Sequence, residues 1–250
     1  GSFGDFAAAS LTKFFPVRDG GCLASRHVVL RFHPKRAQGR QRLLRDALAM
    51  IEAANYYGRL KALRPLGWTL GQLRSGLRQV LGSGDKRREA QAMSGAGDGF
   101  DAASLDTRAS PFTRTALGIL SHRRIVERRR QNFAKLLRGL SDLEGCRPLV
   151  TELPDGVVPY MFPLYCDRLD EVFPIFEDRA LPMQRFGQFL WPGVDQDSCP
   201  ISARYSKHLL QLPCHQEISE AEIDWIIETV RKVMQDDASR PAGGDPCPAF

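Results

Sequence analysis

Residues 146–236 alternate short apolar segments with amphipathic helices, and this pattern limits what the chain can fold into. The clearest element is the last helix, where Ser219 and Glu222 have the spacing of a capping box. The apolar residues that follow at helical spacing are Ile223, Ile226, Ile227, Val230 and Met234. A helix with one apolar stripe must bury it against another layer, so we expect a compact α/β unit here.

Two apolar segments of this stretch are predicted to be strands. Residues 157–165 are apolar enough for a buried strand, although Pro159 and Pro163 indicate an edge strand or a bent one. Residues 209–212 form a second, shorter candidate. Asp167 is expected to cap a helix between them. The apolar side of that helix comprises Leu169, Val172, Phe173 and Phe176.

The upstream part of the chain has the pattern of strands followed by helices. Residues 1–33 predict strand, loop and strand, with a further β-branched run at 27–32. Residues 40–64 predict a helix, and a shorter amphipathic stretch covers about 70–81. The apolar stripe of the first helix would comprise Leu44, Ala47, Leu48, Ile51 and Ala54. Residues 82–110 resemble a linker, and 112–140 predict one long helix or a kinked pair.

Composition excludes several classes of protein. No apolar run is long enough for a membrane helix, and the first ten residues lack a signal peptide, so a cytoplasmic protein is expected. The six cysteines are scattered, which favours reduced thiols and no zinc site. The net charge of +6 suits anionic partners. The basic run at 122–130 is interpreted as a solvated helix face, and nucleic acid is not an expected partner.

The first 23 residues carry the most specific motif. The run Gly1-Ser2-Phe3-Gly4-Asp5 opens a strand-like segment, Ser10 and Lys13 follow, and Gly20-Gly21 leads into the next strand. This order and spacing resembles the stretch around the cofactor lysine of the DegT/DnrJ/StrS sugar aminotransferases, which are fold-type I enzymes dependent on pyridoxal phosphate. The resemblance identifies Lys13 with the Schiff-base lysine and Ser10 with the serine that binds the cofactor phosphate.

Those residue types suit the chemistry that the resemblance implies. A lysine amine can act as a nucleophile toward a carbonyl when burial or nearby positive charge lowers its pKa, and it can then carry a proton. Pyridoxal phosphate would supply the electron sink. A serine three residues upstream can donate a hydrogen bond to a phosphate, and paired glycines allow close backbone packing.

Three later motifs resemble the same family in the same order. They are Arg129-Arg130-Gln131-Asn132-Phe133, Val158-Pro159-Tyr160-Met161-Phe162-Pro163-Leu164 and Leu210-Gln211-Leu212-Pro213-Cys214-His215. The resemblance therefore covers residues 1–33 and about 111–235.

His215 is interpreted as a loop or packing histidine rather than a catalyst. Trp191 is interpreted as a packing tryptophan, with a substrate-facing role as the alternative, and the acids at Asp167, Asp170 and Glu171 as helix-start acids rather than a metal site.

The predicted fold is α/β, the C-terminal part of a PLP-dependent transferase fold, with the end of the large domain followed by a small α/β C-terminal domain. The expected segments are the end of the PLP-binding large domain at 1–33, a helical segment and flexible linker at 34–110, a connecting helix at 111–145, the small domain at 146–236 and a disordered tail at 237–250.

The resemblance implies a homodimeric aminotransferase that moves an amino group from an amino donor to a keto sugar, either free or nucleotide-linked, in amino-sugar or polysaccharide biosynthesis. Three departures keep an alternative open. The family's N-terminal half, with its ring-pairing aspartate, is expected to be missing; Phe14-Phe15-Pro16 replaces the usual asparagine; and residues 34–110 do not match. The alternative is a truncated, non-catalytic remnant that acts as an interaction protein.

Overall fold

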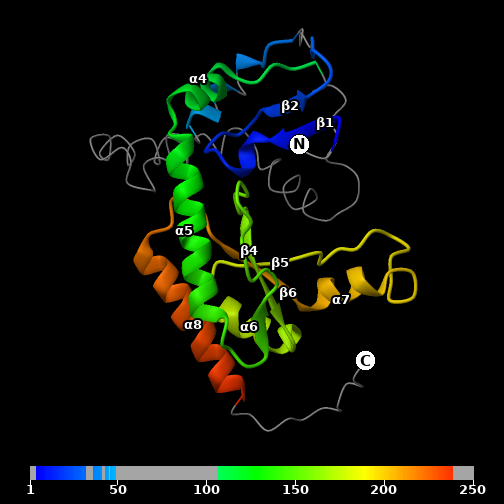
Figure 1. The fold of residues 1–250 in the computed structure, drawn as a ribbon, viewed down its shortest axis with the longest axis vertical. Coiled ribbons are helices and arrows are strands. Elements are labelled where there is room, and N and C mark those ends of the chain that lie inside the picture. Colours follow the sequence, from blue (N-terminus) through cyan, green and yellow to red (C-terminus); the bar gives the residue numbers. More distant parts are fainter. Residues whose placement is uncertain (1–3, 32–35, 41–42, 45, 49–105, 239–250) are drawn as a thin grey trace, which may run out of the picture. The chain divides into compact units, whose positions relative to one another are not determined.

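A computed structural model describes residues 4–31, 36–40, 43–44, 46–48 and 106–238. The chain forms two compact units, residues 1–121 and residues 122–250 (Figure 1). Their boundary falls within the segment 112–140, which the sequence predicts to be one long helix or a kinked pair. Two helices are present there, α4 (Pro111–Ile119) and α5 (His122–Leu140), so the alternative of one long helix is wrong.

The C-terminal unit is built around a four-stranded antiparallel sheet of order β3-β4-β6-β5. The strands are β3 (Cys146–Pro148), β4 (Met161–Cys166), β5 (Gln184–Arg185) and β6 (Leu209–Pro213). The helices of this unit are α5, α6 (Leu169–Asp178), α7 (Pro200–His208) and α8 (Glu220–Ala238). Helices α5 and α8 lie side by side (Figure 1).

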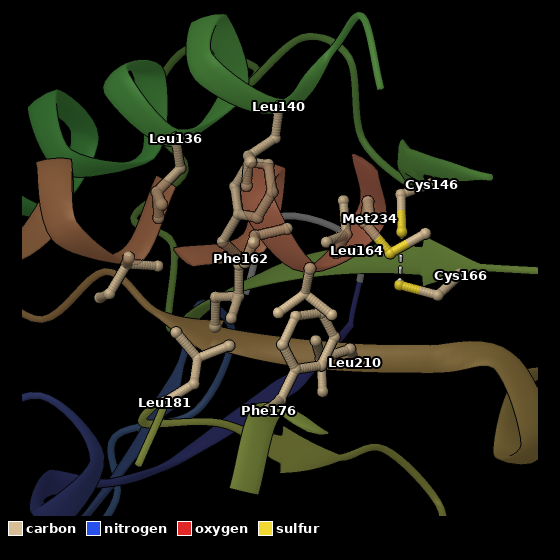
Figure 2. Close-up of a cluster of buried hydrophobic side chains, with 14 of the residues drawn as sticks. Leu136, Leu140, Cys146, Phe162, Leu164, Cys166, Phe176, Leu181, Leu210 and Met234 are labelled. Carbon is tan, nitrogen blue, oxygen red and sulfur yellow. Dashed lines mark hydrogen bonds between the residues drawn. The ribbon is translucent and has the colours of Figure 1, made fainter. Parts of the chain in front are cut away.

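Alternation along the strands divides the sheet into two faces. Phe162 and Leu164 of β4 lie opposite Leu212 and Leu210 of β6, and all four side chains are completely buried (Figure 2). They join apolar side chains from α5, α6 and α8 in one core, which includes Leu136, Leu140, Val172, Phe176, Ile223, Ile226, Val230 and Met234. Tyr165 points to the other face, where its ring stacks on His208 at 5.1 Å between centroids.

The capping box at the start of α8 is confirmed. The backbone N–H of Ser219 donates to Glu222 Oε2 at 2.7 Å, and the N–H of Glu222 donates to Ser219 Oγ at 3.2 Å. The two bonds satisfy donors that a helix start leaves without partners in the helix. The predicted strand at 209–212 and the apolar stripe of α8 are also present as expected.

Strand β4 is central rather than an edge strand, which corrects the interpretation of Pro163. The carbonyl of Pro163 accepts a hydrogen bond from the N–H of Leu149 at 3.0 Å. The backbone nitrogen and carbonyl of Pro163 therefore face β3 and not β6. Strand β3 ends at Pro148, so the nitrogen of Pro163 lies at the end of the pairing between β3 and β4. A proline is tolerated at this position because the missing N–H costs at most one terminal hydrogen bond.

Asp167 does not cap α6, contrary to the prediction. The N-cap residue is Arg168, which makes no side-chain capping bond, and Asp167 instead accepts a hydrogen bond from Arg147 at 3.5 Å. The Asp167 carboxylate is thus paired with a residue of β3 and not with the start of α6. The predicted apolar side of α6 is correct, since Leu169, Val172 and Phe176 are buried and Phe173 packs against the core.

The N-terminal unit contains a two-stranded antiparallel sheet of β1 (Phe6–Ser10) and β2 (Gly21–Ser25). A single 3-10 turn, η1 (Leu11–Lys13), follows β1 directly. The register pairs Ser10 with Gly21 and Phe6 with Ser25, so the predicted strand, loop and strand are confirmed. Within the described part of this unit, Val17 and Ala116 are the buried apolar side chains.

The predicted strand at 27–32 is wrong for its described residues. Ser25 Oγ accepts hydrogen bonds from the N–H groups of His27 and Val28, and the chain bends away from the sheet there. Val29 is 83% exposed, so its β-branched side chain finds no pleated surface to pack on. The β propensity of this segment is high, but the local side-chain hydrogen bonds decide the backbone path.

Only the start of the predicted helix at 40–64 lies among the described residues, and these are helical. Its expected apolar stripe is wrong at this end, because Leu44 and Leu48 are exposed while Asp46 is buried beside Arg18. The helix at 70–81, most of the linker at 82–110 and the tail beyond 238 lie outside the described residues. Among the described residues, no helix is long and apolar enough to cross a membrane.

Candidate functional site

Ser10 and Lys13, the two candidate site residues, lie at the two ends of the η1 turn. Ser10 is the last residue of β1 and the N-cap of η1, and Lys13 is the last residue of η1. Both side chains are exposed, and the hydroxyl of Ser10 lies 3.0 Å from the hydroxyl of Thr12. Ser10 itself has an extended backbone, with φ −89° and ψ 123°, so the regular spacing of side chains in the turn does not extend to it. The loop carries an exposed hydroxyl and, three residues later, an exposed amine.

Gly20 closes this turn, and its glycine character is required. Its φ angle of +98° lies in the region that other residues rarely adopt. A Cβ atom there would lie 3.0 Å from Leu11 Cδ1 and 3.1 Å from Thr113 Cγ2. The carbonyl of Gly20 also accepts a hydrogen bond from the N–H of Leu11 at 3.2 Å. Gly21 meets only an ordinary contact with the Ala9 carbonyl, so the close approach predicted for the glycine pair depends on Gly20 alone.

Asp19 anchors the same loop to the start of α4. Its carboxylate accepts hydrogen bonds from the Ser110 N–H at 2.7 Å, from the Ser110 hydroxyl at 3.1 Å, and from the Thr113 hydroxyl and the Gln38 amide. Burial raises the pKa of Asp19, but the bonds from Thr113, Ser110 and Gln38 outweigh it and hold the pKa below its ordinary value. The Ser110 hydroxyl in turn accepts from the Thr113 N–H at 3.1 Å and caps α4.

Sequence reasoning missed this anchor. Ser110-Pro111 is a typical start for a helix, and that signal was available in the sequence. Nothing in the sequence connects that start to Asp19, which lies 91 positions earlier. We call the set of Asp19, Gln38, Ser110 and Thr113 the Asp19 anchor. Its hydrogen bonds hold the loop that carries Lys13, and none of these bonds involves the Lys13 amine.

A second polar cluster lies in the C-terminal unit around Arg129. Its side chain is fully buried, and its Nε donates to Gln216 Oε1 at 2.7 Å. One terminal nitrogen donates to the carbonyls of Pro159 and Tyr160, both at 3.1 Å. Burial lowers the pKa of Arg129, but an arginine stays charged in proteins, so neutral acceptors share this positive charge.

The Arg129 cluster corrects the interpretation of the basic run as a solvated helix face. Arg124 pairs with Glu217 at 2.9 Å, and Arg130 donates to the carbonyls of Pro154 and Val157. Only part of the run faces solvent, as Arg123 does with a side chain that is 88% exposed. The buried Arg129 and the partly exposed Arg124 and Arg130 connect α5 to the segments that enter β4 and leave β6, which is a structural role.

His215 lies at the edge of the Arg129 cluster. Its carbonyl accepts a hydrogen bond from the side chain of Asn132 at 2.8 Å, and its Nδ1 lies 3.2 Å from the N–H of Glu217. Burial and the positive charge of Arg129 lower the pKa of His215. A half-buried histidine whose carbonyl and ring both contact neighbouring segments fits the predicted loop and packing role.

The structure also describes Trp191 and two of the acids at the start of α6. Trp191 is 71% exposed, so its interpretation as a packing tryptophan is wrong. The loop around it is rich in turns, and within the described chain no layer covers it. Asp170 and Glu171 pair with Arg185 and Arg168, and no group of metal-ligating side chains gathers anywhere in the described residues.

Comparison with known proteins gives partial matches only. No family model and no curated protein matches the chain. Among solved structures, the aminotransferase TlmJ from Streptoalloteichus hindustanus matches 46% of this chain with 25% identity and a TM-score of 0.40. DesV from S. venezuelae matches 52% with 22% identity and a TM-score of 0.42. A DegT DnrJ EryC1 StrS aminotransferase from Brucella abortus matches 44% with 21% identity and a TM-score of 0.35.

These matches cover 33%, 36% and 31% of the three solved chains, so this chain spans about a third of their length. The mixed α/β class predicted from the sequence is observed in the helices and antiparallel strands of the two units. The chain is thus a mixed α/β protein that is similar, over 44–46% of its length and at low identity, to solved aminotransferase structures.

Proposed function

We propose that this chain is part of a cytoplasmic, homodimeric aminotransferase that uses pyridoxal phosphate and transfers an amino group from an amino donor to a keto sugar. The observation that carries the proposal is the η1 turn. It carries the exposed hydroxyl of Ser10 and the exposed amine of Lys13 three residues apart on one loop, which Gly20 closes with a φ of +98°. This loop supports the assignment that the sequence motif suggests.

The residues of the turn fit a phosphorylated carbonyl compound. Lys13 would hold the cofactor through its amine, and Ser10 would donate a hydrogen bond to its phosphate. When bound, the cofactor supplies the electron sink for amino transfer. The same amine can take a proton from the substrate and return it. The Asp19 anchor keeps the loop in place while the amine acts.

Borohydride trapping tests the assignment of Lys13. The purified chain is incubated with sub-stoichiometric pyridoxal phosphate, reduced and mapped by mass spectrometry. We expect the reduced adduct mainly on Lys13 and its loss in Lys13→Ala. The matched control is Lys207→Ala, because Lys207 is also exposed but lies on α7 of the other unit. Labelling spread evenly over the exposed lysines would contradict the assignment.

Ser10→Ala tests the phosphate contact separately. A hydrogen bond to a charged group contributes about 1.5–3 kcal/mol, so its loss should weaken binding of pyridoxal phosphate roughly tenfold or more. Pyridoxal, which lacks the phosphate, should bind the variant and the parent equally. An equal loss for both ligands would mean that Ser10 shapes the turn rather than contacting the phosphate.

A non-catalytic interaction protein is the second candidate function, and one observation favours it. Lys13 and Ser10 are both exposed, whereas a lysine nucleophile is usually activated by burial or by a neighbouring cation. A chain that remains folded, as judged by circular dichroism, and gives no selective adduct on Lys13 would support this candidate over the enzyme.

A further inference from the structure

Two cysteines face each other across the first two strands of the C-terminal sheet. Cys146 of β3 and Cys166 of β4 are direct partners in the antiparallel register. Both side chains are buried, with 5% and 0% exposure, and their sulfur atoms lie 2.8 Å apart (Figure 2). A disulfide bond is about 2.04 Å long, so the two sulfurs are within ~0.8 Å of bonding distance.

The register places the pair where a cross-strand disulfide is sterically feasible. The N–H of Asp167 donates to the carbonyl of Gly145 at 2.9 Å. Gly145 directly precedes Cys146, and Asp167 directly follows Cys166. In an antiparallel ladder this pattern marks a non-hydrogen-bonded pair, in which the two Cα atoms lie about 4.5 Å apart. Disulfides need a Cα separation of about 4.4–6.8 Å, so no backbone movement is required.

We propose that Cys146 and Cys166 are a reversible redox pair that forms an intramolecular disulfide in the presence of a low-molecular-weight disulfide oxidant. The thiolate of one cysteine attacks the oxidant, forms a mixed disulfide and releases one thiol. The second cysteine then attacks the mixed disulfide and releases the second thiol. The protein loses two hydrogens and two electrons, and the oxidant is reduced to two thiols.

Burial decides how the reaction can start. The hydrogen bond between the thiols and their burial raise the pKa of Cys166 far above its ordinary value, so the folded protein contains little thiolate there. Strand β3 has only three residues and lies at the edge of the sheet, with β4 as its one neighbour. Local opening of such an edge exposes Cys146 without unfolding the core. The rate of oxidation should therefore follow the opening of β3.

The disulfide would fix the edge strand to the centre of the sheet. It would close the loop formed by residues 147–165, which includes the segment bonded to Arg129 and Arg130. A cross-link lowers the conformational entropy of the unfolded chain, so the oxidised form should unfold at a higher urea concentration than the reduced form. In a reducing compartment the pair stays as thiols until an oxidant appears, which is the typical behaviour of regulatory cysteines.

The sequence provides a clean assay. Trypsin does not cut between Arg147 and Pro148, so both cysteines lie in the single peptide from Gly139 to Arg168, which contains no other cysteine. The full chain is incubated with oxidised glutathione, denatured and alkylated without reductant, and then digested. We expect this peptide to lose two hydrogens and to carry no alkyl group. Dithiothreitol should restore two alkylation sites.

Matched variants separate this pair from the remaining cysteines. Cys146→Ala should leave the peptide with one alkylated cysteine and should abolish the difference in urea midpoint between oxidised and reduced protein. Cys214→Ala, a change at another buried cysteine, should preserve both the missing hydrogens and the midpoint difference. Two alkylated cysteines in the parent peptide after prolonged oxidation, also under mild urea that opens β3, would overturn the proposal. The result does not depend on cofactor binding by Lys13.

Discussion

The C-terminal unit buries a continuous apolar core, whereas the described part of the N-terminal unit depends on hydrogen bonds to one carboxylate. In the C-terminal unit, apolar side chains from several helices and strands converge on Phe162 and Leu164. In the N-terminal unit, the sheet of β1 and β2 leaves Phe6 and Leu23 more than half exposed. The Asp19 anchor, rather than apolar burial, connects its loop to α4.

This difference predicts which kind of substitution should lower the stability of each unit. Burial of apolar area is worth about 25 cal/mol per Å² and has no directional requirement, so a core tolerates polar changes outside it. A hydrogen-bonded anchor depends on the charge of one side chain and on pH. The C-terminal unit should therefore respond to the loss of side-chain volume, and the N-terminal unit to the loss of charge.

The largest expected effect is that of Phe162→Ala. Phe162 is completely buried and its ring lies 4.9 Å from that of Phe133, so truncation leaves a cavity in the core. We expect a loss of about 3–5 kcal/mol in the free energy of unfolding. Urea unfolding followed by tryptophan fluorescence measures it, since Trp191 and Trp225 both belong to the C-terminal unit.

Phe6→Ala is the matched change in the N-terminal unit. Phe6 is 56% exposed, so we expect an effect of no more than about 0.5 kcal/mol. An effect as large as that of Phe162→Ala would break the comparison, because it would mean that β1 buries its apolar side chains in solution.

Arg129→Lys should have the next largest effect. A lysine ammonium cannot reach Gln216 and the carbonyls of Pro159 and Tyr160 at once, because it lacks the planar fork of an arginine. We expect a loss of roughly 2–3 kcal/mol, measured by the same unfolding experiment. The control is Arg123→Lys on the same helix, where the exposed side chain should tolerate the change without a shift in urea midpoint. Equal midpoints for both variants would mean that the buried arginine contributes no net stability.

Local signals in the sequence predicted local structure well. The capping box of Ser219 and Glu222 and the apolar stripe of α8 lie within one segment, and both have the expected form. The strands around η1 were predicted for the same reason, since Gly20 marks the turn between them. In these cases, residues a few positions apart determine the backbone.

Long-range partners explain what the sequence could not predict. Arg129 looked like one of several solvated arginines, because its acceptor Gln216 lies 87 positions away. Asp167 was predicted to cap a helix, but the register of β3 and β4 places Arg147 beside it. The facing cysteines depend on the same register, which periodicity does not specify. For the candidate site, the family resemblance suggested Lys13 and Ser10 but gave no sign of the Asp19 anchor.

Asp19→Ala should have a smaller effect than Phe162→Ala or Arg129→Lys, and it should have the clearest pH dependence. The change removes an acceptor shared by Ser110, Thr113 and Gln38, and the first two are buried. We expect a loss of about 1–2 kcal/mol, localised to the start of α4, and faster hydrogen exchange of the Ser110 amide. Asp5→Ala is the control, because the Asp5 side chain is 84% exposed.

The sign of the pH effect follows from the lowered pKa of Asp19. A carboxyl whose folded pKa lies below its ordinary value of 3.8 stabilises the fold fully above that value. The contribution falls as the pH drops through the folded pKa and the carboxylate becomes protonated. The parent chain should therefore lose protection of the Ser110 amide in acid, while Asp19→Ala shows little protection at any pH. If the two proteins exchanged this amide equally fast at neutral pH, the N-terminal unit would not depend on the Asp19 anchor.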